Sequence, residues 1–155
     1  MIGRQGGENI TIMYSDDLFI WDNYEVIMKP EDTWGNVQLR TCGSPIKTTD
    51  GWLVITHAVG PLRKYVLGAR LMDLKDPSKI IKKLNRPLLS PNEEEREGYV
   101  PNVVYSCGSM AHGDNLILPY AKSDSASTFA SINIEELINE MDVYKSKSEI
   151  KQDVI

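Results

Sequence analysis

The sequence predicts an all-β protein that carries one short helix near its C-terminus. Most apolar residues follow the period-two pattern of half-buried strands, and few follow helical spacing. One arrangement, a turn followed by an apolar strand that ends in Tyr or His, occurs three times along the chain. Strong helix signals are confined to the segment 134–141.

The predicted strands begin with residues 9–14, where apolar and polar side chains alternate. Residues 52–57 follow the pair Asp50-Gly51, a strong hairpin-turn signal. Residues 65–74 form the next predicted strand, in which Gly68 marks a bulge or a close approach of another segment. Three further strands are predicted, over residues 100–107, 115–120 and 128–132.

The helix predicted over residues 134–141 has a clear start signal. Asn133 is the expected N-cap, and Glu136 stands three residues further on, as in a capping box. The residues after the helix mix charge and serine without an apolar face. We therefore assign residues 1–142 to the domain and predict that residues 143–155 form a charged, disordered tail.

The threefold arrangement covers residues 7–14, 50–57 and 113–120. Intervals of about 40–50 residues, with insertions, are typical of propeller blades built from four antiparallel strands, although other all-β repeats also produce them. Propeller strand ends meet around a central channel, which would bring Tyr14, His57 and Tyr120 towards one axis. Alternatively, the two tyrosines are strand-end aromatics that pack between blades.

Composition excludes several classes of protein. The 155 residues suffice for a core without disulfide or metal support, because a chain of this length buries roughly 70% of its unfolded surface. No apolar run approaches the length of a membrane-spanning helix, and no secretory signal is visible at the start. The net charge of −5 argues against a nucleic-acid partner. We expect a cytoplasmic protein with no membrane partner.

The two cysteines, Cys42 and Cys107, are too few for a disulfide framework or a four-ligand zinc site. We interpret them as small buried hydrophobes in a reducing cytosol. The sequence contains no P-loop, no His-Glu-x-x-His and no paired-Cys metal motif. No metal site and no cofactor are therefore predicted.

Three residues form a candidate anion-binding set. Arg4 precedes the first repeat, Lys47 precedes the Asp50-Gly51 turn, and His57 ends the strand that follows. If the repeats are blades, these side chains converge near one mouth of the channel. Such a set suits phosphate, since Arg supplies a planar fork, Lys a point charge and His a switchable donor.

Several segments, taken in order, carry a family resemblance that covers nearly the whole chain: residues 3–5, 7–9, 42–48, 51–57, 65–69, 74–79, 98–108 and 118–124. Together they resemble the C-terminal half of glycoside hydrolase family 130, the mannoside phosphorylases and related β-mannosidases. The resemblance implies a five-bladed β-propeller with a central sugar-binding channel, of which this chain would form about the last half of the ring.

The resemblance also implies a reaction. In the phosphorolytic members, inorganic phosphate attacks the anomeric carbon of a terminal β-mannoside, giving α-mannose 1-phosphate with inversion, while one Asp acts as general acid. Phosphate is then a co-substrate and the β-mannoside oligosaccharide the sugar partner. Only the acid carboxylate is required, because phosphate replaces the water and base carboxylate of an inverting hydrolase.

Carried over by motif, Arg4, Lys47 and His57 resemble phosphate-binding residues, and Asp124 resembles the carboxylate that hydrogen-bonds sugar hydroxyls. Tyr65 and Arg63 are expected neighbours in the substrate site. The family's general-acid Asp belongs to the N-terminal half, so no residue of this chain is assigned a catalytic role. Gly6 departs from the family pattern, in which Asp is common at this position.

Three hypotheses follow for function. The first is a truncated or split β-mannoside phosphorylase, inactive alone and active with an N-terminal half. The second is a hydrolytic β-mannosidase of the same family, which would lack the phosphate cations and offer a carboxylate base. The third is a non-catalytic carbohydrate-binding or assembly module that self-associates to cover open sheet edges. The presence of Arg4, Lys47 and His57 favours the first.

Overall fold

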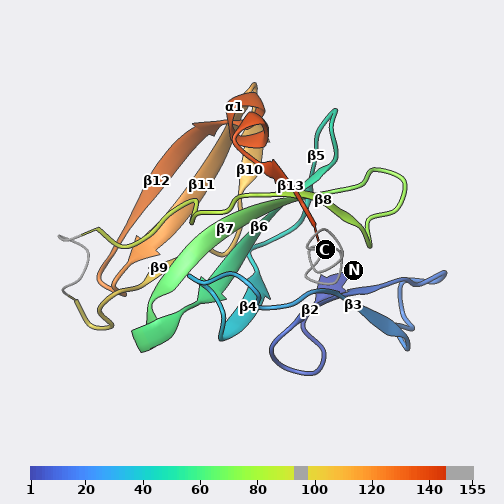
Figure 1. The fold of residues 1–155 in the computed structure, drawn as a ribbon, viewed down its shortest axis with the longest axis horizontal. Helices are drawn as coiled ribbons and strands as arrows, with labels where there is room; N and C mark the ends of the chain where they lie inside the picture. Colours follow the sequence, from blue (N-terminus) through green and yellow to red (C-terminus); the bar gives the residue numbers. More distant parts are fainter. Residues whose placement is uncertain (93–97, 146–155) are drawn as a thin grey trace, which may run out of the picture.

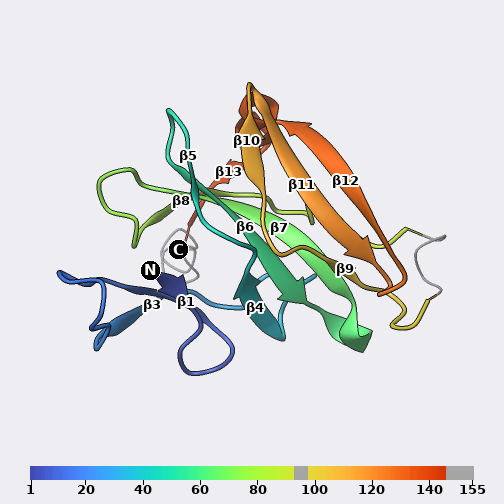
Figure 2. The same ribbon diagram turned by 180° about the vertical axis from the view of Figure 1, so that it is seen from behind.

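The computed structural model describes residues 1–92 and 98–145, which form three antiparallel sheets and one short α-helix (Figure 1). The first sheet has the order β1-β2-β3, the middle sheet β13-β8-β7-β6-β4 with β5 also paired to β6, and the last sheet β10-β11-β12 with β9 also paired to β11. Both views show the middle sheet lying between the other two (Figures 1 and 2).

The bounds of the elements are as follows: β1 Ile2–Gly3, β2 Ile10–Met13, β3 Tyr24–Met28, β4 Gln38–Thr41, β5 Ile46–Lys47, β6 Trp52–Val59, β7 Tyr65–Met72, β8 Ile80–Lys83, β9 Val104–Tyr105, β10 Met110–His112, β11 Asn115–Lys122, β12 Ala126–Asn133, α1 Ile134–Asn139 and β13 Asp142–Val143. A single 3₁₀ turn, Pro61–Arg63, connects β6 to β7 within the described residues. The helices of the described residues are too short and too polar to cross a membrane.

The β6–β7 hairpin is buried on both faces. Every residue of each strand except the first is buried, so the alternation that marks a half-exposed strand is absent. Leu53, Ile55 and Leu67 pack against Leu116 and Leu118 of the last sheet. The intervening positions point the other way, and this second group packs with the first sheet: Val54, Ala58, Val66, Met72, Ile10 and Met28. The middle sheet is therefore covered on each side by a neighbour.

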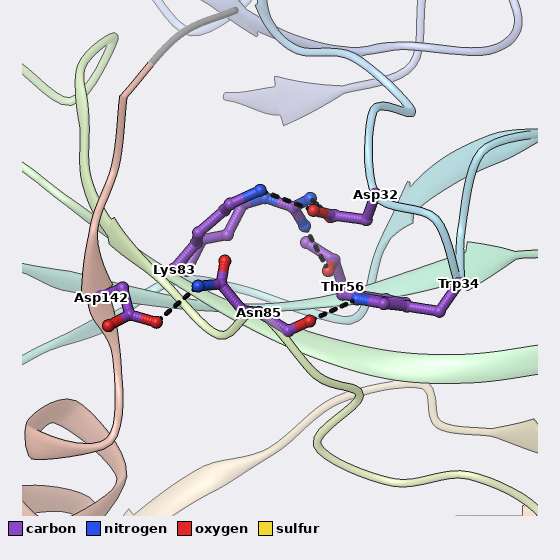
Figure 3. A network of polar contacts seen from close by, with 7 residues as sticks. Asp32, Trp34, Thr56, Lys83, Asn85 and Asp142 are labelled. Carbon is purple, nitrogen blue, oxygen red and sulfur yellow. Dashed lines mark hydrogen bonds and ion pairs between the residues drawn. The ribbon is translucent and has the colours of Figure 1, made fainter. Parts of the chain in front are cut away.

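A buried carboxylate shared by two cations holds the β3–β4 connection to the middle sheet (Figure 3). Arg70 on β7 donates from Nη2 to Asp32 Oδ2 at 2.6 Å, and Lys83 Nζ on β8 lies 2.6 Å from Asp32 Oδ1. The other guanidinium nitrogen of Arg70 donates to Thr56 Oγ1 at 3.0 Å. The side chains of Arg70 and Asp32 are only 6% and 5% exposed, so these charges interact in a low dielectric.

Trp34 fixes the same connection from a second position. Its indole lies over Gly68 on β7, where an added Cβ would sit 2.8 Å from a ring carbon, so this glycine is the close-approach point expected from the sequence. Trp34 Nε1 donates to Asn85 O at 3.0 Å, and the Asn85 amide donates to Asp142 at the start of β13 (Figure 3). The β3–β4 connection is thereby held against the far edge of the middle sheet.

The predicted all-β class and the short helix near the C-terminus are confirmed. The three repeated segments, centred on β2, β6 and β11, fall in three different sheets, as expected if each sheet is a blade. Asn133 Oδ1 accepts a hydrogen bond from Glu136 N at 3.0 Å, which confirms the predicted N-cap, although the helix ends at Asn139. A ring of five blades remains a prediction.

The strand predicted over residues 100–107 is wrong except for β9, which covers only Val104–Tyr105. Pro101 has no N–H to donate to a ladder, and Asn102 adopts a φ of 63°, in the left-handed region. The interpretation of both cysteines as buried is also corrected. Cys42 is buried and donates from Sγ to Ser106 O at 3.1 Å, whereas Cys107 is exposed.

The predicted tail begins at residue 143, but regular structure includes Val143, which pairs with Lys82 in β13. Tyr144 N also donates to Ile81 O at 3.0 Å, which extends the ordered contacts by one residue. The rest of the predicted tail, residues 146–155, lies outside the described residues.

Replacing Asp32 by Ala is expected to lower the free energy of unfolding by about 3–5 kcal/mol, because the Arg70 guanidinium would stay buried without its carboxylate. Urea titrations of wild type and variant measure this difference. The matched control is Glu140→Ala, which removes an exposed ion pair with Arg86 and should change stability by less than about 1 kcal/mol. Equal losses in the two variants would contradict a special role for the buried pair.

Replacing Asn133 by Ala is expected to cost about 1 kcal/mol, because Glu136 N would lose its acceptor at the first turn of α1. Asn139→Ala is the control, since Asn139 is exposed at the other end of the helix and its side chain makes no hydrogen bond within the described residues. Thermal unfolding of the two variants should separate them. A larger loss for Asn139→Ala would show that the cap does not set helix stability.

Candidate functional site

His57 is the most enclosed of the predicted site residues. It lies on β6 with 1% of its surface exposed, on the face of the middle sheet that meets the last sheet. The Ser106 backbone N–H donates to His57 Nε2 at 3.0 Å. The Tyr105 ring packs against the imidazole, with 4.1 Å between ring centroids and an interplanar angle of 57°. Because a backbone N–H only donates, Nε2 is unprotonated and neutral His57 carries its hydrogen on Nδ1.

The imidazole is neutral at physiological pH. Burial lowers the pKa of His57 from 6.5 to about 4, and the positive charge of Arg40 acts in the same direction. From the sequence, His57 is expected to be a switchable donor. The structure instead makes it a fixed, neutral hydrogen-bond donor.

Three buried polar atoms lack a hydrogen-bond partner in the described part of the chain: Arg4 Nη1, His57 Nδ1 and Ser109 Oγ. A buried donor without an acceptor costs roughly 1–3 kcal/mol, and such atoms are rare in folded proteins. Two of the three belong to the predicted anion-binding set, and both are donors. An acceptor-rich ligand such as an anion would satisfy them.

The loop that carries Arg4 is attached to β4, the strand beside His57. Leu39 N donates to Glu8 O at 3.0 Å, and Gln38 Nε2 donates to Gly7 O at 3.3 Å. β4 in turn pairs with the end of β6, with Arg40 opposite His57. The tight turn includes Gly6, whose φ of 86° lies in the left-handed region that favours glycine. Arg4 and His57 are thus connected through one intervening strand.

Lys47 lies apart from this pair. It pairs with Trp52 at the start of β6, five residues before His57, which corresponds to roughly 16 Å along a strand. Its side chain is exposed, with Nζ 5.9 Å from the Trp52 ring centroid. It lines an open groove of about 800 Å³ between the β5–β6 turn and the β10–β11 turn, with Asp50 and Asp114 among its other lining residues. The structure does not bring Lys47 together with His57.

The predicted sugar-site residues Tyr65 and Asp124 lie at a common edge. Tyr65 begins β7 and forms a bridge with Val103, and Val103 O accepts a hydrogen bond from Ser123 N at 2.9 Å. Asp124 follows Ser123 in the β11–β12 turn, exposed, with a φ of 51°. The third predicted member, Arg63, is exposed two residues before Tyr65.

Among the predicted channel-facing aromatics, Tyr120 packs against the core between the middle and last sheets, whereas Tyr14 is 62% exposed. For Tyr120 this matches the alternative of an aromatic packed between blades.

Three residues that contact or face His57 were not predicted as site residues from the sequence: Tyr105, Ser106 and Arg40. The strand-pairing register places these residues beside His57, and no local sequence pattern predicts that register. Within the described residues, His, Cys, Asp and Glu side chains form no cluster that could hold a metal ion.

The chain is similar to known proteins in both sequence and structure. A family model described as beta-1,4-mannooligosaccharide phosphorylase matches residues 3–143. The chain is 40% identical over 131 residues to a 1,2-beta-oligomannan phosphorylase of Thermoanaerobacter sp. (strain X514), covering 83% of this chain and 44% of that protein. It is 43% identical over 112 residues to a beta-1,2-mannobiose phosphorylase of the same organism, covering 71% and 37%.

The fold of the chain is also similar to that of a solved phosphorylase structure. The beta-1,2-mannobiose phosphorylase from Listeria innocua, solved in complex with beta-1,2-mannobiose, superposes with a TM-score of 0.79 at 29% identity, covering 88% of this chain and 40% of that one. The chain therefore spans less than half the length of these relatives. The family model nevertheless matches nearly all of it. This chain belongs to glycoside hydrolase family 130.

Proposed function

We propose that this chain is the phosphate-binding part of a β-mannoside phosphorylase. The observation that carries the proposal is the pair of buried donors without acceptors, Arg4 Nη1 and His57 Nδ1, in the described chain. Relatives named as phosphorylases of β-linked mannosides support the same substrate class. Phosphate fits these donors because its oxygens accept several charge-assisted hydrogen bonds at once.

In the proposed reaction, phosphate attacks the anomeric carbon of a terminal β-mannoside, and the glycosidic bond breaks with inversion to give α-mannose 1-phosphate. Arg4 and His57 hold the phosphate oxygens beside the sugar, which converts a bimolecular attack into an oriented one. Asp124 accepts hydrogen bonds from sugar hydroxyls at the edge where Tyr65 lies. The proton for the leaving oxygen comes from an Asp outside this chain.

In the proposal, Lys47 contacts a ligand in its own groove, separately from the phosphate site of Arg4 and His57. Its place in the groove beside Asp50 and Asp114 suits a sugar or a counter-charge better than the enclosed site of His57. Arg63, exposed before β7, is proposed as a neighbour of the sugar rather than of the phosphate.

Mixing the purified chain with a separately expressed N-terminal part of the Thermoanaerobacter oligomannan phosphorylase is expected to release α-mannose 1-phosphate from a β-mannoside. Release should require both polypeptides and inorganic phosphate, as measured by product chromatography. Activity of the chain alone would refute the assignment of the acid to another segment. Turnover without phosphate would replace the proposal with a hydrolytic β-mannosidase.

The proposal also requires His57 to stay neutral, which predicts a specific pH dependence. Because the pKa of His57 falls from 6.5 to about 4 on folding, the unfolded chain binds a proton that the folded chain does not as pH decreases below 6.5. This contribution to stability, about 3 kcal/mol, is complete above pH 6.5 and disappears towards pH 4.

Urea titrations at pH 7 and pH 4 test this dependence. His57→Gln should remove most of the difference between the two pH values, whereas His112→Gln, at an exposed position, should leave it unchanged. Imidazole NMR signals of the chain, which has only these two histidines, should show His57 as the Nδ1–H tautomer. An ordinary pKa for His57 would contradict the neutral donor.

A further inference from the structure

Arg40 lies directly across the strand pair from His57. The two are Cα partners in the β4–β6 register, and directly opposed residues project from the same face of a sheet, with Cβ atoms roughly 5 Å apart. The alternation on β4 agrees, because Leu39 points to the opposite face and packs against Ala58 and Val66. Arg40 therefore points to the side of the sheet where His57 meets Tyr105 and Ser106.

The guanidinium of Arg40 is held by a neutral group. Nε and Nη2 donate to Gln38 Oε1 at 3.1 Å and 2.8 Å. Throughout residues 1–92 and 98–145, no carboxylate lies within ion-pair distance of Arg40, whereas Arg70 pairs with Asp32 and Arg86 with Glu140. No carboxylate of the described residues therefore offsets the positive charge of Arg40 beside the His57 imidazole. Its remaining N–H groups are available to donate there.

Gln38 also ties this position to the loop of Arg4. Its amide nitrogen donates to Gly7 O at 3.3 Å while its amide oxygen accepts from Arg40. One side chain therefore fixes the guanidinium of Arg40 and the turn after Arg4. Hydrogen bonds of β4 and of Gln38 thus connect the segments that carry Arg4, Arg40 and His57.

We propose that Arg40 is a phosphate-binding residue of this site, whose guanidinium lies across the β4–β6 pair from His57. The inference rests on the proposed function and changes the membership of the site. A neutral imidazole contributes a hydrogen bond but no charge, and Lys47 lies at the other end of β6. The guanidinium fork matches two phosphate oxygens, which a lysine ammonium does not.

The test uses the full chain and inorganic phosphate, with binding followed by ³¹P NMR. Arg40→Gln is expected to weaken phosphate binding about tenfold or more, the loss typical for a hydrogen bond to a charged group. Arg40→Lys should retain part of the affinity, because the charge remains while the fork is lost. Arg86→Gln removes the same charge at an exposed, distant ion pair and should bind within about twofold of wild type.

A second readout separates a local effect from loss of the fold. Removing the charge of Arg40 should raise the pKa of His57, measured by imidazole NMR, while Arg86→Gln leaves it unchanged. Phosphate binding by Arg40→Gln equal to wild type, with binding weakened in His57→Gln, would overturn the role of Arg40 and leave the proposed function standing. Absence of phosphate binding by the wild-type chain would overturn the phosphate site itself, and Arg40 with it.

Discussion

The double-sided burial of the β6–β7 hairpin is the constraint on which the rest of the structure depends. Both faces of this hairpin must be covered, so one sheet packs on each side and the chain is arranged in three layers. Any polar side chain within the hairpin needs a partner from a neighbouring sheet. The two faces meet that requirement differently, and the proposed site rests on this difference.

On the face towards the first sheet, the buried polar side chains of the hairpin have partners within the described residues. Arg70 has Asp32 and Thr56, and Asp32 has Lys83 as well. On the face towards the last sheet, His57 receives one hydrogen bond from Ser106 and keeps an unmatched donor. The paired charges of Arg70, Asp32 and Lys83 hold the β3–β4 connection against the middle sheet. On the other face, the unmatched Nδ1 of the enclosed His57 imidazole, within the described residues, is the observation on which the proposed site rests.

Sequence patterns located the central strands and missed the edges. β6, β7 and β11 are long and rich in apolar residues, so their burial is visible in the sequence itself. In contrast, β4 and β8 have few buried residues. Gln38–Thr41 has one buried residue, and Ile80–Lys83 has none. Such strands exist because a neighbour offers a free edge, and local propensity does not encode that.

The site shows the same limit. His57 was predictable because it lies in a recognisable strand, but its partners were not, since Arg40 reaches it only through the β4–β6 register. Lys47 illustrates the opposite error. It is close to His57 in the sequence, yet the β5–β6 hairpin places it opposite Trp52, at the far end of the strand. Proximity along an extended chain becomes distance in space, because each strand residue advances about 3.3 Å.

The return of β13 to the middle sheet has a consequence for the order in which the chain matures during synthesis. Asp142 and Val143 pair with Lys83 and Lys82, so the edge of β8 is completed only after the entire last sheet has been made. Until then the emerging polypeptide presents an unpaired strand edge, the feature that invites intermolecular pairing. Lysines are among the residues that keep exposed strand edges from pairing with other chains, and this edge carries two of them, Lys82 and Lys83.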